Sequence, residues 1–202
     1  MNSKDINENL VEFNYSINER DREKKNGCKG SAVWFTGPSA SGKSTIANEL
    51  EILLFNKGYP VVILDGDNVR KGLCSDLDFS LNSRTENVRR VAEVAKIIKN
   101  SGFIVLCCLV SPLIEQRKLA RSIIEKNFIE CYVKTPLDKC MERDPKGFYK
   151  KARNNQILDF TGVNSIYEES LNSEIVVQTE LVDERKAAAK IYKLMKEKFL
   201  IF

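Results

Sequence analysis

Short apolar runs alternate with amphipathic stretches along most of this chain. The apolar runs predict five strands, at residues 32–35, 61–64, 103–110, 128–133 and 175–177. Apolar positions at helical spacing predict helices over 43–57, 84–100 and 182–198, with two more after Ser111-Pro112 and from Pro136. Because parallel strands need helical crossovers, the alternation predicts an α/β fold: a five-stranded parallel sheet flanked by helices in three layers.

The N-terminal segment lacks this alternation. Residues 1–30 are polar and end in a basic stretch over 20–29, so we expect a loosely packed arm followed by a single domain over 31–202. The arm has neither an apolar signal core nor an Arg-rich amphipathic pattern, which favours a cytoplasmic location, although an atypical signal for an organelle stays open. The longest apolar run, 103–110, is too short to cross a bilayer.

Composition narrows the chemistry. The 202 residues contain no histidine, which excludes triads, metal cages and acid–base mechanisms that depend on imidazole. The net charge of +4 is too mild to indicate a nucleic-acid partner. The six cysteines include no C-x-x-C pair, and Cys107, Cys108 and Cys131 fall in predicted strands, so they are interpreted as small buried apolar residues.

A phosphate-binding motif follows the first predicted strand. Residues 37–44 fit the spacing G-x-x-x-x-G-K-S between a strand and a helix. Backbone N–H groups of such a loop face phosphate oxygens, Lys43 reaches the β- and γ-phosphates, and Ser44 ligates Mg²⁺. The alternative interpretation of these residues is a tight strand–helix turn that binds no ligand. We expect a nucleoside triphosphate in a P-loop NTPase-type domain, held by Gly37, Pro38, Ser39, Ala40, Ser41, Gly42, Lys43, Ser44 and Thr45.

Charged residues at the other strand ends indicate an acceptor site, because ligands of parallel sheets bind at the carboxyl ends of strands. Asp65 is assigned to turn chemistry, whereas Asp67 would hold Mg²⁺ or an acceptor hydroxyl and Arg70 an anion. Arg84 and Asn87 share the inward face of a helix. Arg84 would bind an anionic ligand or, alternatively, form an ion pair with Asp65 or Asp67.

A dense basic segment covers residues 143–153, where five cations stand against Asp144 alone. From the residues alone, a solvated helix face and a mobile basic lid over polyphosphate are equally good interpretations.

Taken together, these motifs resemble those of adenylylsulfate kinases, from about residue 20 to the C-terminus. The resemblance is carried by Trp34-Phe35-Thr36-Gly37 and the phosphate loop, Asp65-Gly66-Asp67-Asn68-Val69-Arg70, Phe79-Ser80, Arg84-x-x-Asn87-x-Arg89-Arg90, Ser111-Pro112, Arg143-Asp144-Pro145-Lys146-Gly147, Lys150-Lys151-Ala152-Arg153 and Phe160-Thr161-Gly162. This set is more specific than the phosphate loop, which other small kinases share.

The resemblance implies that MgATP phosphorylates the 3′-hydroxyl of adenosine 5′-phosphosulfate. It implies no nucleic-acid or membrane partner and allows a homodimer, since the family is often dimeric. Phe79 and Phe160 would sandwich the adenine, Arg70 and Arg84 would take the phosphosulfate, and Arg143 and Arg153 would belong to a lid of about 143–162 over ATP. The residues implied to contact the acceptor are Asp67, Arg70, Phe79, Arg84, Asn87, Val110, Ser111, Lys146 and Phe160.

The catalytic residues on this interpretation are Lys43, Asp67 and Ser111. Descriptions of the family sometimes make the serine of Ser-Pro a phosphoserine intermediate. On physical grounds we favour direct in-line transfer, with Asp67 orienting the hydroxyl or taking its proton and with Lys43, Mg²⁺ and lid cations stabilising the charge.

Several positions depart from the family pattern. Pro38 and Ala40 stand where Leu and Gly are common, Ile114 stands where an Arg often follows Ser-Pro, and Glu12-Phe13-Asn14 replaces a usual Trp-His pair. Another small-metabolite kinase and a non-catalytic regulatory module are the competing interpretations. A GTPase is a poorer one, since the chain has no N-K-x-D signature.

Overall fold

A five-stranded parallel sheet forms the centre of the protein, in a computed structural model that describes residues 13–157 and 159–199. The strand order is β2-β3-β1-β4-β5, and all four neighbouring pairs are parallel. The strands are β1 (Ser31–Thr36), β2 (Val61–Asp65), β3 (Ile104–Cys108), β4 (Phe128–Lys134) and β5 (Ile175–Gln178). The predicted α/β class and number of strands are therefore confirmed.

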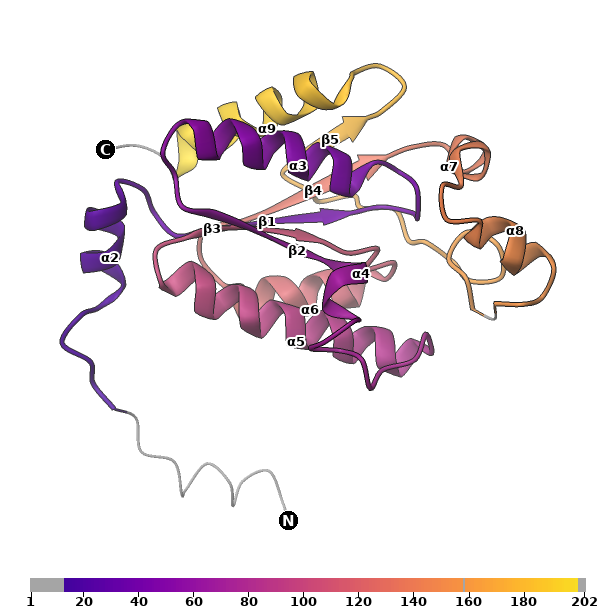
Figure 1. Ribbon diagram of the computed structural model, residues 1–202, viewed down its shortest axis with the longest axis horizontal. Helices are drawn as coiled ribbons and strands as arrows, with labels where there is room; N and C mark the ends of the chain where they lie inside the picture. Colours follow the sequence, from indigo (N-terminus) through magenta and orange to yellow (C-terminus); the bar gives the residue numbers. More distant parts are fainter. Residues whose placement is uncertain (1–12, 158, 200–202) are drawn as a thin grey trace, which may run out of the picture.

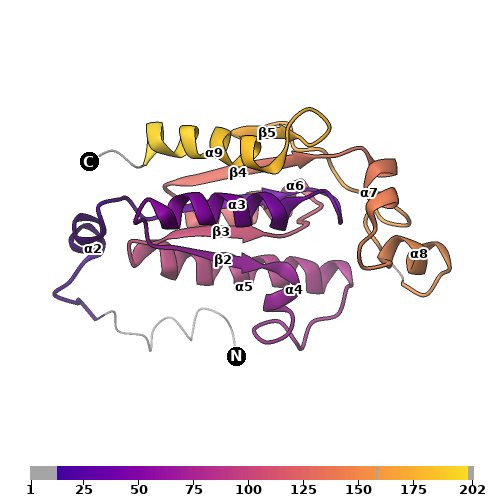
Figure 2. The same cartoon turned by 45° about the horizontal axis from the view of Figure 1, so that its top comes forward.

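Helices cover both faces of this sheet (Figures 1 and 2). The helices are α2 (Glu19–Asn26), α3 (Lys43–Asn56), α4 (Gly66–Val69), α5 (Leu81–Asn100), α6 (Ile114–Ile124), α7 (Leu137–Arg143), α8 (Phe148–Arg153) and α9 (Glu184–Lys198). One apolar core joins α3 and α9 to the sheet, with Leu50, Leu54 and Ile191 fully buried. A second core joins α5 and α6 to the opposite face, around Trp34 and Val91.

Several element boundaries differ from the prediction by one to three residues, and two of the larger differences have a local reason. Strand β3 ends at Cys108 rather than at residue 110, because the Val110 carbonyl turns to accept from the Thr36 hydroxyl at 2.8 Å. Helix α5 begins three residues before Arg84, since Ser80 caps it by accepting from the Ser83 N–H. Pro136 is the N-cap of α7 rather than its first residue.

The described part of the arm, residues 13–30, is only partly loose. Helix α2 contains no buried residue and lies at the end of the sheet opposite α7 and α8 (Figure 1). The end of α2 and the residues after it are anchored, because Asn26 donates to the Gly102 carbonyl at 2.9 Å and Cys28 is fully buried. Glu12 lies outside the described residues, so the departure predicted at 12–14 is only partly visible.

The cysteines are buried, as the sequence indicated: all six are free thiols inside the protein. Burial raises the pKa of the Cys28 thiol to about 11, with Glu23 adding to the effect, so this group stays protonated near neutral pH. Among the described residues, no helix combines the length and apolar character that a bilayer span needs.

Candidate active site

The carboxyl ends of the strands meet at one cleft, as predicted. The cleft has a volume of about 1070 Å³ and is lined by residues 39–46, by 65–67 after β2, by 108–112 after β3 and by parts of 143–161. All nine residues expected to contact an acceptor line it. Helices α7 and α8 stand at this end of the sheet in both ribbon views (Figures 1 and 2). The cleft is large enough for two nucleotide-sized ligands.

The phosphate loop is held in a conformation that its glycines permit. Gly37 and Gly42 have φ values of 150° and 102°. A Cβ on Gly37 would lie 2.6 Å from the Val133 carbonyl oxygen and 2.9 Å from Ser41 Oγ, so the turn requires glycine. Helix α3 begins directly afterwards at Lys43, and its N-cap, Gly42, has no side chain to satisfy the first N–H groups. These N–H groups and the helix dipole make an anion-binding end.

Lys43 is buried beneath this loop. Its ammonium donates to the carbonyls of Gly37 at 2.9 Å and Pro38 at 2.7 Å. Burial lowers its pKa from 10.5 to about 8, with Lys146 contributing slightly in the same direction. Gly37 and Pro38, predicted to contact the nucleotide, therefore hold the lysine through their carbonyls, whereas residues 39–45 line the cleft.

Ser44 and Asp65 form a contact that the sequence did not predict. The Ser44 hydroxyl donates to Asp65 Oδ2 at 2.6 Å, and Asp65 Oδ1 accepts from the Asp67 N–H at 3.0 Å. Asp65 therefore caps α4, which is the turn chemistry predicted for it, and also reaches the phosphate loop. Only the sheet order could have revealed this, because it brings the end of β2 to the start of α3.

The acceptor end of the cleft combines cations with aromatic rings. Arg70 lies 4.4 Å above the Phe79 ring and donates to the carbonyls of Leu77 and Asp78 at 3.1 and 2.9 Å. Phe79 itself is 56% exposed. Burial is the largest cause that lowers the pKa values of the Arg70 and Arg84 guanidinium groups, which nonetheless remain charged near neutrality.

Arg84 joins α5 to the segment after α8. Its guanidinium donates to the Phe79 carbonyl at 2.8 Å, to Thr161 Oγ1 at 2.7 Å and to the Asp159 carbonyl. The alternative ion pair with Asp65 or Asp67 is not found among the described residues. Asn87, one turn further on, is 5% exposed, and its Nδ2 has no hydrogen-bond partner in the part of the chain described. A buried amide without a partner at a cleft wall is costly and indicates a ligand contact.

Asp67 forms an ion pair with Lys146, across the mouth of the cleft. Both side chains are about half exposed, at 55% and 51%, so the pair is open to exchange with a ligand. The sequence analysis did not predict this pair, which joins the end of β2 to the segment 143–162.

The lid segment contacts the phosphate loop at two points. Arg143 approaches the Ala40 carbonyl at 3.5 Å, and Tyr149, which the sequence analysis did not single out, donates to the Ser39 carbonyl at 3.0 Å. Phe160 packs edge-on against Tyr149 with ring centroids 5.0 Å apart. Arg153 is not among the cleft-lining residues; its guanidinium lies 2.7 Å from Met141 Sδ instead. Arg143 and Lys146 thus line the cleft, whereas Arg153 does not, and the lid stays a prediction.

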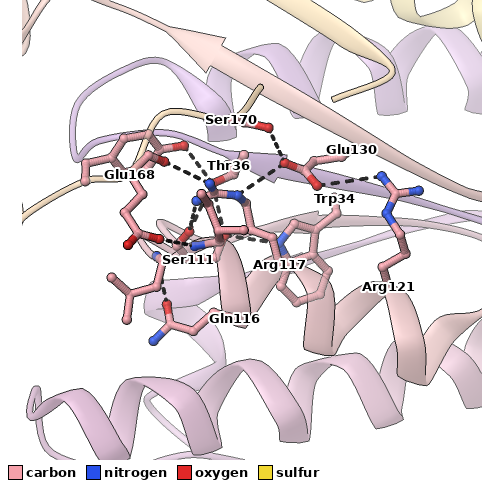
Figure 3. A network of polar contacts seen from close by, with 12 residues as sticks. Trp34, Thr36, Ser111, Gln116, Arg117, Arg121, Glu130, Glu168 and Ser170 are labelled. Atoms are coloured by element: carbon pink, nitrogen blue, oxygen red, sulfur yellow. Dashed lines mark hydrogen bonds and ion pairs between the residues drawn. The ribbon is translucent and has the colours of Figure 1, made fainter. Parts of the chain in front are cut away.

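Ser111 is among the residues that line the cleft, and its hydroxyl is bonded to Trp34 and Thr36 (Figure 3). Ser111 Oγ accepts from Trp34 Nε1 at 3.1 Å and donates to Thr36 Oγ1 at 3.1 Å, and the residue is 3% exposed. Thr36 is in turn hydrogen-bonded to the Tyr167 hydroxyl at 2.9 Å. The Ser111 hydroxyl thus has both a donor and an acceptor partner inside the protein.

The departures from the family pattern fall on different parts of the structure. Ala40 has φ +58°, a left-handed conformation that strains any residue except glycine. Pro38 contributes its carbonyl to Lys43. Ile114 begins α6 and is not among the residues that line the cleft; its N–H donates to Glu168 Oε2 at 2.5 Å.

The chain is similar to proteins of known activity over nearly its whole length. A family model described as adenylylsulphate kinase matches residues 29–178. An adenylyl-sulfate kinase from Clostridium acetobutylicum is 47% identical over 189 residues, covering 94% of each chain. One from Thermodesulfovibrio yellowstonii is 46% identical over 196 residues, covering 96% of this chain and 98% of the relative.

A solved structure agrees with these relatives. The Mycobacterium tuberculosis APS kinase in complex with AMPPNP and APS matches with a TM-score of 0.81 and 41% identity, covering 83% of this chain and 98% of that one. The phosphate loop, the strand order and the motifs at the strand ends are thus accounted for together: the chain belongs to the adenylyl-sulfate kinase family of P-loop kinases.

Proposed function

We propose that this protein transfers the γ-phosphate of ATP to the 3′-hydroxyl of adenosine 5′-phosphosulfate, forming ADP and 3′-phosphoadenosine 5′-phosphosulfate. The observation that carries the proposal is the composition of the cleft. A phosphate loop stands at one end, and Arg70, Phe79 and Arg84 stand at the other. Such an arrangement suits one polyphosphate and one acceptor that has both an anionic group and an aromatic base.

ATP fits the loop because backbone N–H groups, a lysine ammonium and a serine hydroxyl are all available to it. Residues 39–45 present backbone N–H groups, and Lys43 lies beneath them with its ammonium on two neutral carbonyls. A phosphate would offer this buried cation a charged partner, which offsets its burial far better than carbonyls do. Ser44, with Asp65 behind it, would hold Mg²⁺, which usually binds one or two protein oxygens besides phosphates and water. When bound, Mg²⁺ neutralises charge that develops on the phosphoryl oxygens.

The acceptor would lie between Phe79 and Phe160. Stacking on an aromatic ring suits any nucleobase and contributes about 1–3 kcal/mol per base. Arg70 and Arg84 would bind the phosphosulfate, since planar guanidinium groups match such oxyanions in a bidentate manner. Asn87 would supply its free Nδ2 to the acceptor.

Direct in-line transfer is the mechanism that this geometry favours. Asp67 is an exposed carboxylate that lines the cleft, and breaking its ion pair with Lys146 would free it to orient the hydroxyl or accept its proton. A nucleophilic Ser111 would need a base within hydrogen-bond reach. Its hydroxyl proton instead lies on Thr36, a neutral hydroxyl, which argues against a phosphoserine intermediate.

The test is ADP release with adenosine 5′-phosphosulfate and with a panel of other acceptors, such as shikimate, gluconate and adenosine 5′-monophosphate. Wild-type protein should turn over the phosphosulfate, and Lys43→Ala should lower kcat by several orders of magnitude. Turnover with another acceptor alone would refute the proposal. Binding of both nucleotides without turnover would favour the regulatory module.

Two further predictions concern the protein in the cell. We propose a cytoplasmic location and a homodimer, the assembly common in the family. Light scattering on the purified protein measures the mass directly, and a mass of one 23.0 kDa chain would refute the dimer.

A further inference from the structure

The turn that carries Ser111 rests on a buried arginine to which the sequence analysis gave no role. Arg117, on α6, is 3% exposed. Its Nη1 donates to the Ser111 carbonyl at 2.8 Å and its Nη2 to the Glu168 carbonyl at 2.8 Å (Figure 3). Its Nε lies 3.2 Å from the carboxylate of Glu130, on β4. One planar guanidinium thus joins three segments that are distant in the sequence.

The backbone at Ser111 needs such support. Its φ of +36° is in the left-handed half of conformational space, which costs a residue with a side chain about 1–3 kcal/mol. Such a conformation persists only where the surroundings hold it from several sides. Here Trp34 and Thr36 bond the Ser111 hydroxyl, while Arg117 bonds its carbonyl.

The second partner connects the same turn to the chain that follows the lid segment. The Glu168 N–H donates to the Pro112 carbonyl at 2.8 Å, and the Glu168 carboxylate accepts from the Ile114 N–H. Arg117 then takes the Glu168 carbonyl, and its guanidinium lies 5.6 Å from the centroid of the Tyr167 ring. The turn and residues 167–168 are therefore joined directly through Pro112 and Ile114 and indirectly through Arg117.

Glu130 keeps the arginine in place. Its side chain is 8% exposed, and its carboxylate also accepts from the Ser170 hydroxyl and lies 3.6 Å from Arg121. A buried guanidinium needs such a counter-charge. Arg121 shares the carboxylate of Glu130 but pairs mainly with Glu174, and it bonds neither Ser111 nor Glu168.

We propose that Arg117 is a positioning residue for the phosphoryl acceptor. By holding the Ser111 carbonyl and the Glu168 carbonyl together, it fixes the backbone wall at Val110 and Ser111 on which the acceptor binds. The identity of that acceptor rests on the proposed function, whereas the dependence of the wall on Arg117 does not. Lysine at this position keeps the charge but cannot donate to three directions in one plane.

The experiment compares Arg117→Lys with the matched control Arg121→Lys, which alters the same charge network without touching the wall. Three quantities are measured well below the melting temperature: kcat/KM for the acceptor, the KM for ATP and the emission of Trp34. Trp34 is the single tryptophan of the chain and bonds Ser111 directly, so its emission reports the wall without any substrate. A misplacement of about 1 Å can cost up to 100-fold in rate.

For Arg117→Lys we expect kcat/KM for adenosine 5′-phosphosulfate to fall about 10- to 100-fold, with the ATP KM changed less than about threefold and Trp34 emission shifted. Arg121→Lys should retain wild-type values for all three. If both variants keep the wild-type acceptor kcat/KM and Trp34 emission, the proposal is wrong, and Arg117 contributes to stability alone.

Should Arg117→Lys fail to fold, the double variant Arg117→Met/Glu130→Gln removes both buried charges together. It should fold and show the same loss in acceptor kcat/KM with the same shift in emission, and wild-type values in it would overturn the proposal. If wild-type protein does not turn over the phosphosulfate, the proposed function fails, while the shift in Trp34 emission still decides the role of Arg117.

Discussion

Lys43 should make the folded protein less stable at neutral pH than at alkaline pH. Its pKa is lowered from 10.5 to about 8 by burial, and it is 8% exposed. The unfolded chain therefore binds more protons than the folded protein between these two values, and stability rises with pH across that window. At one pKa unit per 1.36 kcal/mol, the cost below pH 8 is about 3.4 kcal/mol.

The perturbation is Lys43→Met, which keeps an apolar chain of similar length and removes the ammonium. The free energy of unfolding of both proteins is measured by urea denaturation from pH 7 to pH 10. Because most of the 3.4 kcal/mol is released in this range, wild type should gain about 2.5 kcal/mol relative to Lys43→Met. Ser44→Ala is the control, since it alters the same loop without removing a titrating group.

A stability difference between wild type and Lys43→Met that stays constant from pH 7 to pH 10 would refute this reasoning. It would mean that the two carbonyls of Gly37 and Pro38 compensate the buried ammonium fully. The predicted outcome would instead mean that the buried ammonium of Lys43 lowers the stability of the folded protein and is kept because it binds phosphate.

Three further substitutions test the cleft. Arg84→Ala should raise the acceptor KM about 10- to 100-fold, the equivalent of a charged hydrogen bond of about 1.5–3 kcal/mol, and a normal KM in steady-state kinetics would remove Arg84 from the site. Gly37→Ala should lower the unfolding free energy by about 2–4 kcal/mol, because its Cβ would lie 2.6 Å from the Val133 carbonyl oxygen. A melting temperature equal to that of wild type would contradict this close approach. Ala40→Gly should raise the unfolding free energy by about 0.5–1 kcal/mol without lowering kcat, because relief of the strain at φ +58° exceeds the entropy that glycine adds to the unfolded chain. A variant that urea unfolds more easily than wild type would show that Ala40 is not strained.

The architecture could be predicted because it depends on periodicity. Strands buried on both faces appear as continuous apolar runs, and the helix that contains Val88, Val91 and Ala95 shows its inward face plainly. The phosphate loop has a spacing that phosphate binding sets, so the sequence indicates it directly. The acceptor residues are implied by the family resemblance; all of them line one cleft, and their contacts with an acceptor stay a prediction.

Contacts between distant segments could not be predicted. The bond from Ser44 to Asp65 depends on the position of β2 in the sheet, and the sequence contains no signal for strand order. Arg117 belongs to a helix with several charged residues, so the sequence does not distinguish it from an exposed cation. Its burial follows from its partners on β4 and at residues 167–168, which only the fold brings together. The turn of Arg153 away from the cleft likewise depends on where α7 places Met141.

The most direct test of the account follows the phosphate itself. Wild-type protein is incubated with adenosine 5′-phosphosulfate and ATP radiolabelled at the γ-phosphate, and the products are separated and treated with a 3′-nucleotidase. The account predicts that the label moves to the phosphosulfate, is released by the nucleotidase, and passes to the acceptor without becoming bound to the protein. Label that stays on ATP, or that reaches the acceptor only through a Ser111 phosphoenzyme, would contradict it.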